Sequence, residues 1–328
     1  MGTTFEHDVV IIGAGPAGMC AALYAGRAML NAVVLERGFP GGELLNTELV
    51  EDYPGFETIL GSELAQKFAD HAVKFGANIK TGVTVTTLRK RGDMFETITD
   101  SGDTYLSPTA IISAGGNPVK LGIPGELEYA GKGVSYCAIC DGAFFRNQTI
   151  AVVGGGDAAA EESDFLTRYA SKVYLIHRRD ELRASKILQQ RAFENPKIEP
   201  IWDTVVDRVE ANGDGLVNNL KLRNVHSGAT RDLAATGMFV FIGFRPNTGI
   251  IDGHVDHDEM GYLRTDTNMQ TSIPGLFAAG DLRAQLTRQV TTAVGDATTA
   301  AIAAEKYLKA LRDGTKNPRI EGAGGYTA

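Results

Sequence analysis

A glycine-rich loop between an apolar run and a helical stretch occurs twice in this chain, and it constrains the fold more than any other feature. The first copy is Gly13–Gly18 (GAGPAG), after an apolar run at residues 8–12 and before an alanine-rich stretch at 19–29. The second is Gly154–Ala159 (GGGDAA), between residues 149–153 and 160–169. A strand, a glycine turn and a helix in this order open a nucleotide-binding βαβ unit. The chain is therefore predicted to be α/β, with two Rossmann-like three-layer domains.

The first loop has the spacing of a dinucleotide site. Gly13 permits a tight turn, Gly15 lets the backbone approach a pyrophosphate, and Gly18 lets the helix pack closely on the strand. The next strand, expected at 31–36, ends in Glu36, whose carboxylate can accept hydrogen bonds from both hydroxyls of an unphosphorylated ribose. This context favours a dinucleotide over the alternative, a structural turn rich in glycine.

The second loop is followed by basic residues instead of an acid. The strand expected at 172–176 leads into His177, Arg178 and Arg179, and Arg183 lies one turn further. Guanidinium groups suit a 2′-phosphate, which an acid would repel. The second dinucleotide is therefore predicted to be NADPH and not NADH; a solvated basic cluster is the alternative. The loop residues expected to contact it are Gly154, Gly156, Asp157 and Ala158.

Two of the three cysteines, Cys137 and Cys140, are separated by two residues and precede the second loop. A pair at this spacing can form a redox-active disulfide, and the neighbouring Asp141 can transfer the proton that thiol exchange requires. The alternative is half of a zinc site, but zinc needs four ligands and the sequence has no second Cys or His pair at usable spacing. We therefore expect a redox pair and no metal, with Cys20 a buried, inert thiol.

A second candidate cofactor contact lies near the C-terminal end of the chain. Asp281 follows Gly280 at the end of an apolar run at 275–279, where its carboxylate can accept a hydrogen bond from a ribityl hydroxyl of a flavin. The alternative is a simple helix N-cap. Arg288, Gln289 and Val290 begin a helix expected to reach about 311, whose N-terminus would face the pyrimidine end of the flavin.

Length and composition complete the picture. A chain of 328 residues favours two domains, and the turns near Pro118 and Pro246 are candidate boundaries. If the last helix packs on the first domain, the second is inserted into it: residues 1–117 and 247–328 form one domain and 118–246 the other. A net charge of −8 argues against nucleic-acid binding. The sequence shows no signal peptide and no apolar run long enough to span a membrane, so the cytoplasm is expected.

Taken together, these residues resemble the low-molecular-weight thioredoxin reductases over nearly the whole chain. The most specific part is the CxxCD pattern at Cys137–Asp141, placed just before the second glycine loop. The other matching motifs are Gly13–Gly18, Gly41-Gly42, Tyr53–Gly55, Gly154–Asp157, His177–Arg179 with Arg183, Ala278–Asp281, and Arg288-Gln289.

The resemblance implies a homodimeric enzyme in which electrons pass from NADPH through FAD to the Cys137–Cys140 disulfide and then to thioredoxin or a thioredoxin-like protein. It places Cys140 nearer the flavin and makes Cys137 the thiol that attacks the partner. It also implies that the two domains reorient about the links near Pro118 and Pro246. Further FAD contacts that it implies are Ala17, Gly42, Asn46, Asp52, Val85 and Gly115.

The chain departs from the family pattern at Glu43, where glutamine is usual, and at Asp296, in a helix usually rich in small residues. Tyr326, in a glycine-rich tail expected to be mobile, could stack on the flavin. Three other functions remain as alternatives: a disulfide reductase with a ferredoxin donor, a ferredoxin–NADP reductase, and a flavin-bearing redox sensor. Arg178, Arg179 and Arg183 argue against the first, and the cysteine pair is unexplained by the second.

Overall fold

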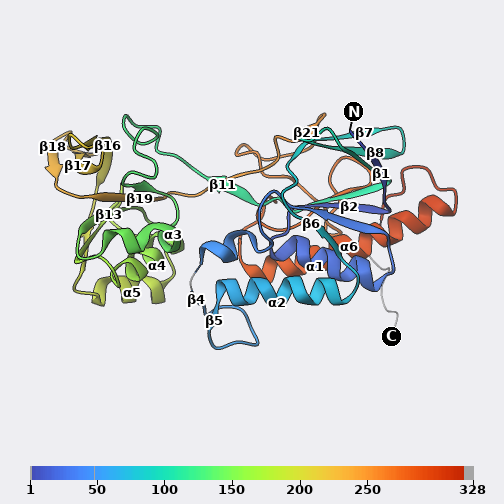
Figure 1. The fold of residues 1–328 in the computed structure, drawn as a ribbon, viewed down its shortest axis with the longest axis horizontal. Helices are drawn as coiled ribbons and strands as arrows, with labels where there is room; N and C mark the ends of the chain where they lie inside the picture. The colour runs from blue at the N-terminus through green and yellow to red at the C-terminus, as the bar shows by residue number, and fades with distance from the viewer. Residues whose placement is uncertain (1, 48, 321–328) are drawn as a thin grey trace. The chain divides into compact units, whose positions relative to one another are not determined.

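The computed structural model describes residues 2–47 and 49–320, so Tyr326 lies outside the described residues. It divides into two compact units, drawn in Figure 1. Unit 1 comprises residues 1–117 and 245–328, and unit 2 comprises residues 118–244. The two connections, β11 (Gly116–Pro118) and β20 (Phe244–Pro246), pair as a two-stranded sheet.

Unit 1 is built on a five-stranded parallel sheet in the order β22-β10-β2-β3-β6. Alternate residues of β2 point to opposite faces, as the period of a strand requires. Val9 and Ile11 belong to the core on the helical side, and Val10 and Ile12 belong to the core on the other side. The strand bounds are β2 Val9–Ile12, β3 Ala32–Leu35, β6 Asn78–Lys80, β10 Thr109–Ile112 and β22 Leu276–Ala278.

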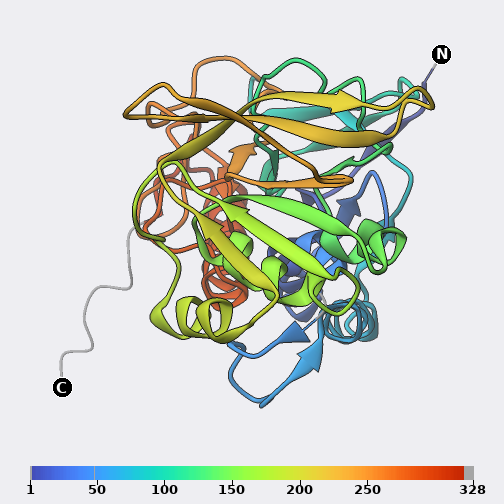
Figure 2. The ribbon, with the colours of Figure 1, turned by 90° about the vertical axis from the view of Figure 1, so that its left-hand side faces the viewer.

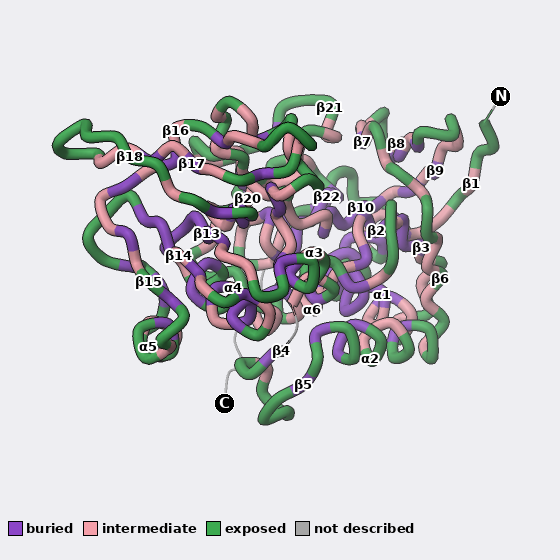
Figure 3. Tube along the Cα trace, turned by 60° about the vertical axis from the view of Figure 1, so that its left-hand side comes forward, coloured by how far each residue is buried: buried purple, intermediate pink, exposed green. Residues whose placement is uncertain are grey.

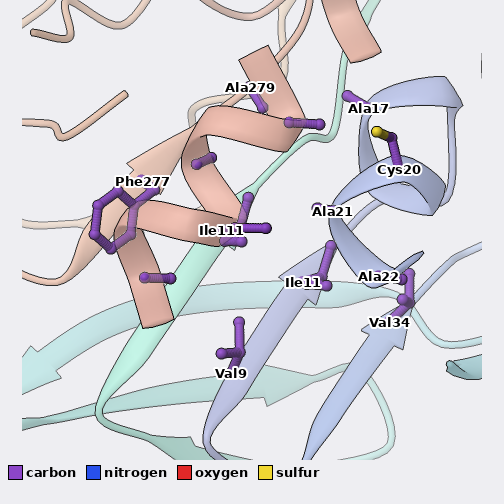
Figure 4. Close-up of a cluster of buried hydrophobic side chains, with 14 of the residues drawn as sticks. Val9, Ile11, Ala17, Cys20, Ala21, Ala22, Val34, Ile111, Phe277 and Ala279 are labelled. Carbon is purple, nitrogen blue, oxygen red and sulfur yellow. The ribbon is translucent and has the colours of Figure 1, made fainter. Parts of the chain in front are cut away.

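Helices α1 (Pro16–Arg27) and α6 (Val290–Arg312) cover one face of this sheet, and α2 (Gly61–Lys74) packs against α1. The contact between α1 and α6 is made by small residues, which let the two helix backbones approach each other closely. Figure 4 shows Ala17 and Ala21 of α1 in this cluster, above Ile11 and Ile111 of the sheet. The expected packing of the last helix on the first unit is therefore present.

A second sheet covers the other face, in the order β1-β9-β8-β7-β21. Leu88, Phe95 and Tyr105 from this sheet join Val10 and Ile12 in one buried cluster. Unit 1 thus has three layers: helices, a parallel sheet and a second sheet. The strand bounds are β1 Thr4–Glu6, β7 Val85–Arg91, β8 Met94–Thr99, β9 Thr104–Ser107 and β21 Ile251–Asp252.

Unit 2 repeats this plan. Its parallel sheet, β12-β19-β13-β14-β15, packs on α4 (Asp157–Leu166) and α5 (Lys186–Glu194) through one core. A second core joins its other face to the antiparallel sheet β16-β17-β18, as Figure 2 shows. The strand bounds are β12 Val134–Ser135, β13 Thr149–Gly154, β14 Lys172–Ile176, β15 Ile198–Ile201, β16 Thr204–Ala211, β17 Val217–Asn224, β18 Thr230–Leu233 and β19 Gly237–Phe241.

Burial follows the layers in both units (Figure 3). The central strands β2 and β13 are buried along nearly all their length, whereas much of α2 and α5 is exposed. Among the described residues, no helix has the length and apolar character needed to cross a bilayer.

Helices α1 and α4 begin three residues earlier than the sequence analysis placed them, at residues 16 and 157 instead of 19 and 160. The reason is the same in both. The second glycine of each loop, Gly15 or Gly156, is itself the N-cap, in an extended conformation. Pro16 suits the first helical position because its missing N–H would have no partner within the helix.

Candidate active site

The first glycine loop is closed by contacts that exclude any side chain at two of its glycines. A Cβ on Gly18 would lie 1.8 Å from the carbonyl oxygen of Gly13, and one on Gly13 would lie 2.7 Å from that of Ser113. Gly15 differs, because its Cβ would meet only the Cα of Gly42, at 3.8 Å. The loop is therefore tight beneath and open at Gly15. Among the described residues no side chain caps α1, so its first N–H groups are available to a phosphate.

Two distant segments meet this loop at the carboxyl end of the parallel sheet. Gly42 (φ +56°) begins the 3-10 helix η1 (Gly42–Asn46), and its Cβ would lie 3.0 Å from the Cα of Gly15. Gly280 (φ +83°) follows β22, and its Cβ would lie 3.1 Å from the Cβ of Ala17. Ligands of open α/β sheets bind at this edge.

Glu36 is hydrogen-bonded within unit 1. Its Oε2 accepts from the backbone N–H of Ala14 at 2.7 Å, and its Oε1 accepts from that of Gly38 at 2.8 Å. A carboxylate oxygen has two lone pairs, so each oxygen can accept a second bond. Glu36 therefore fixes the loop and can still receive ribose hydroxyls.

Asp281 is a buried acceptor that lacks a donor. Its Oδ1 is inaccessible to solvent and has no hydrogen-bond partner in the described part of the chain. Desolvation is the largest influence and raises the pKa of Asp281 to about 6; Arg288 opposes this, while Glu43 and Asp296 add to it. An unsatisfied buried carboxylate is costly and marks a position where a ligand donor fits. A ribityl hydroxyl is such a donor.

We expect Asp281→Asn to have opposite effects on the flavin-free and flavin-bound protein. With the folded pKa near 6, above the ordinary 3.8, stabilisation by the neutral acid is present below about pH 4 and lost as pH rises through 6. At pH 7.5 the flavin-free variant should be about 1–2 kcal/mol more stable than wild type, and at pH 4 about equal. FAD affinity should fall about tenfold to hundredfold. Thermal melts at both pH values and FAD titration check this; unchanged FAD affinity would contradict it.

The other predicted flavin contacts occupy varied positions in unit 1. The Nδ2 of Asn46 donates to the Oε2 of Glu43 at 3.1 Å, and desolvation raises the pKa of Glu43. The Nε of Arg288 donates to the backbone oxygen of Asp281, and its guanidinium lies 3.9 Å from the ring centre of Tyr262. Of the rest, Asp52 is exposed in a turn, Val85 begins β7, Gly115 has φ +55°, Gln289 caps α6, and Val290 packs beside Leu44.

The second loop repeats the geometry of the first. A Cβ on Gly154 would lie 2.2 Å from the carbonyl oxygen of Phe241, and Ala159 is fully buried against it. A Cβ on Gly156 would meet nothing within 4 Å. Ala158, in the first turn of α4, is exposed. This loop is likewise tight beneath and open at its second glycine, where a pyrophosphate can approach.

The predicted basic residues divide into two groups. Arg178, Arg179 and Arg183 are exposed, so their guanidiniums can reach an anion. His177 is buried under the loop: a Cβ on Gly155 would lie 2.2 Å from its Cε1. Desolvation lowers the pKa of His177, a bond to the Gly154 backbone opposes this, and the three arginines lower it further. A neutral His177 thus supports the loop from beneath.

Asp157 anchors the arginine-bearing segment. Its Oδ1 accepts from the backbone N–H of Ser185 at 2.6 Å, and the N–H of Arg183 donates to the carbonyl of Gly155 at 2.6 Å. These bonds tie residues 183–185 to the phosphate loop. The sequence analysis assigned Asp157 a ligand contact and did not foresee this anchoring.

Cys137 and Cys140 form a disulfide, with their sulfurs 2.05 Å apart. Cys137 is half-buried and caps the short helix α3 (Ala138–Asp141), where its Sγ accepts from the N–H of Cys140 at 3.2 Å. Cys140 is exposed and Asp141 half-buried. Cys20, by contrast, is a buried free thiol in α1, and desolvation raises its pKa.

The sequence analysis missed two supporting residues. Ser135 Oγ accepts from the N–H of Cys137 and donates to its carbonyl, both at 3.1 Å. Arg283 pairs with the buried Asp296 (Nη1–Oδ1 2.5 Å), and Asp296 Oδ2 accepts from the N–H of Gly280 at 3.1 Å. An acid within an alanine-rich buried helix was the available signal for the second pair. In the described residues, no group of three or more His, Cys, Asp or Glu side chains could hold a metal ion.

Comparison with known proteins agrees with this geometry. Residues 7–297 match the family described as pyridine nucleotide-disulphide oxidoreductase. The chain is 46% identical to a thioredoxin reductase of Listeria innocua (94% of this chain, 95% of that protein) and 44% identical to one of Bacillus subtilis (94% and 97%). It superposes on the crystal structure of Lactococcus lactis thioredoxin reductase with a TM-score of 0.90, at 46% identity, over 92% of this chain and 99% of that one. The chain therefore belongs to the pyridine nucleotide-disulphide oxidoreductases, and within that family to the thioredoxin reductases.

Proposed function

We propose that this chain is an NADPH-dependent thioredoxin reductase that uses FAD to reduce the Cys137–Cys140 disulfide and, through it, a thioredoxin-like protein. The observation that carries the proposal is the Cys137–Cys140 disulfide in the unit that also holds the second glycine loop. The open position at Gly15 and the unsatisfied Oδ1 of Asp281 support FAD binding in unit 1. When bound, FAD would relay two electrons between the nicotinamide and the disulfide.

The reduced cysteines then carry out thiol–disulfide exchange. The Cys137 thiolate attacks one sulfur of the partner disulfide, and the displaced partner thiolate takes a proton. Cys140 loses its proton and attacks the Cys137 sulfur, which re-forms the Cys137–Cys140 disulfide and releases the second partner thiol. The N–H of Cys140 stabilises the attacking thiolate, and Asp141 is placed to hold the proton.

The exposed arginines support NADPH as the donor. Arg178, Arg179 and Arg183 follow β14, where the ribose of a dinucleotide lies, and a 2′-phosphate is the group that such a cluster binds. A ferredoxin donor would leave this cluster and the second glycine loop without a function.

We also propose the assignment of the two units and the assembly. The FAD-binding part comprises residues 1–117 and 247–328, and the NADPH-binding part comprises residues 118–246. The resemblance to thioredoxin reductases supports a homodimer, and the redox use of a close cysteine pair supports a cytoplasmic location.

Anaerobic titration of the purified protein tests the donor and the cofactor together. We expect NADPH to bleach the flavin absorbance at stoichiometric amounts, and NADH to do so only at concentrations at least about a hundredfold higher. Equal effects of the two nucleotides would overturn the role of the arginines. Failure of both would favour a ferredoxin donor, and reduction without turnover on addition of thioredoxin would favour a redox sensor.

A further inference from the structure

A buried carboxylate that the proposed mechanism does not use lies near the redox disulfide. Glu126 is 0% exposed and belongs to the segment between β11 and β12. Its Oε1 accepts from the N–H of Leu121 at 2.8 Å and from the hydroxyl of Tyr136 at 2.9 Å. Its Oε2 accepts from the N–H of Gly122 at 2.6 Å. Such donors are what make a buried carboxylate tolerable.

These donors come from two separate parts of the chain. Leu121 and Gly122 follow β11, the connection by which the chain enters unit 2, and Gly122 has φ +74°. Tyr136 directly precedes Cys137. A single carboxylate therefore joins the entry segment to the residue that leads into the redox pair.

The backbone around Tyr136 is held by further contacts. Ser135, in β12, pairs with Phe239 of β19, and its hydroxyl brackets the backbone of Cys137. The Tyr136 ring packs against the same buried cluster as Leu121. Burial, and then the bond and charge of Glu126, raise the pKa of Tyr136, so its hydroxyl stays protonated as a donor. The Glu126–Tyr136 bond is thus the side-chain link between the entry segment and the redox pair.

We propose that Glu126 is a positioning residue for the Cys137–Cys140 pair: by holding the Tyr136 hydroxyl it fixes the backbone that carries Cys137 and keeps the two sulfurs at a high effective concentration. Weaker positioning lowers that concentration and favours the dithiol over the disulfide. The inference rests on the proposed redox role of the pair. Its test needs neither NADPH nor a partner protein, so the inference and the proposed function can fail separately.

The experiment equilibrates full-length protein with dithiothreitol buffers and counts free thiols by mass after alkylation under denaturing conditions. In this equilibrium the protein disulfide takes two electrons and two protons from dithiothreitol, which becomes its cyclic disulfide. The variants are Tyr136→Phe, Glu126→Gln and the double variant. The control is Tyr129→Phe, which removes a hydroxyl in the same segment that bonds Glu128. A melting temperature is measured for each variant.

We expect Tyr136→Phe to shift the equilibrium toward the dithiol by about threefold to tenfold, the range for one buried hydrogen bond. A tenfold shift corresponds to about 30 mV. Glu126→Gln should shift it at least as far, the double variant no further than Glu126→Gln, and Tyr129→Phe should match wild type. Tyr136→Phe removes one hydroxyl and tests the link even if Glu126→Gln fails to fold. A wild-type equilibrium in Tyr136→Phe, with or without a lower melting temperature, would overturn the proposal.

Discussion

Replacing Cys137 or Cys140 with serine should lower the rate of thioredoxin reduction by at least about a thousandfold. The two sulfurs form the disulfide of unit 2, and a serine hydroxyl can neither form a disulfide nor carry electrons to a partner. Flavin reduction by NADPH should stay within about twofold of wild type, because no cysteine is needed for hydride transfer. Stopped-flow flavin absorbance and a coupled thioredoxin assay measure the two rates.

The third cysteine provides the matched control. Cys20 is buried in α1, where its Sγ donates to the carbonyl oxygen of Val294 at 3.4 Å, and a serine hydroxyl can make the same bond. Cys20→Ser should leave both rates within about twofold of wild type. Retention of multiple turnovers with a protein disulfide in Cys137→Ser or Cys140→Ser would refute the mechanism.

Removing two of the exposed arginines should abolish the preference for NADPH. In Arg178→Ala/Arg179→Ala we expect the KM for NADPH to rise by at least about a hundredfold, because each lost charge-assisted hydrogen bond to a phosphate contributes about 1.5–3 kcal/mol. The kcat/KM with NADH should change by less than about threefold, since NADH lacks the 2′-phosphate. Steady-state kinetics with both nucleotides give these values.

Arg208→Ala is the control for this experiment, because Arg208 is an exposed arginine of the same unit that lies in β16, away from the glycine loop. It should leave both kinetic constants near wild type and show that loss of one surface charge is not sufficient. A double variant that still prefers NADPH over NADH as strongly as wild type would show that the 2′-phosphate is recognised elsewhere.

Much of the fold was predictable because its signals are local. A strand, a glycine turn and a helix must follow one another in sequence, so β2, β13 and β14 were predicted within one residue of their observed bounds. The helix starts were misplaced by three residues, since the glycines that read as a loop also cap α1 and α4. The cysteine pair, the two open glycines and the exposed arginines were likewise readable from spacing alone.

The sequence by itself therefore determined the two nucleotide-binding units, the redox pair and the candidate cofactors, because these depend on short motifs whose steric and charge requirements lie within a few residues. Only the tertiary structure decided the environment of single side chains. It buried Asp281 Oδ1 without a donor, placed His177 beneath the second loop, and gave Glu126 donors from two segments. Desolvation and hydrogen bonding between distant segments set these properties, and neither exists until the chain has folded.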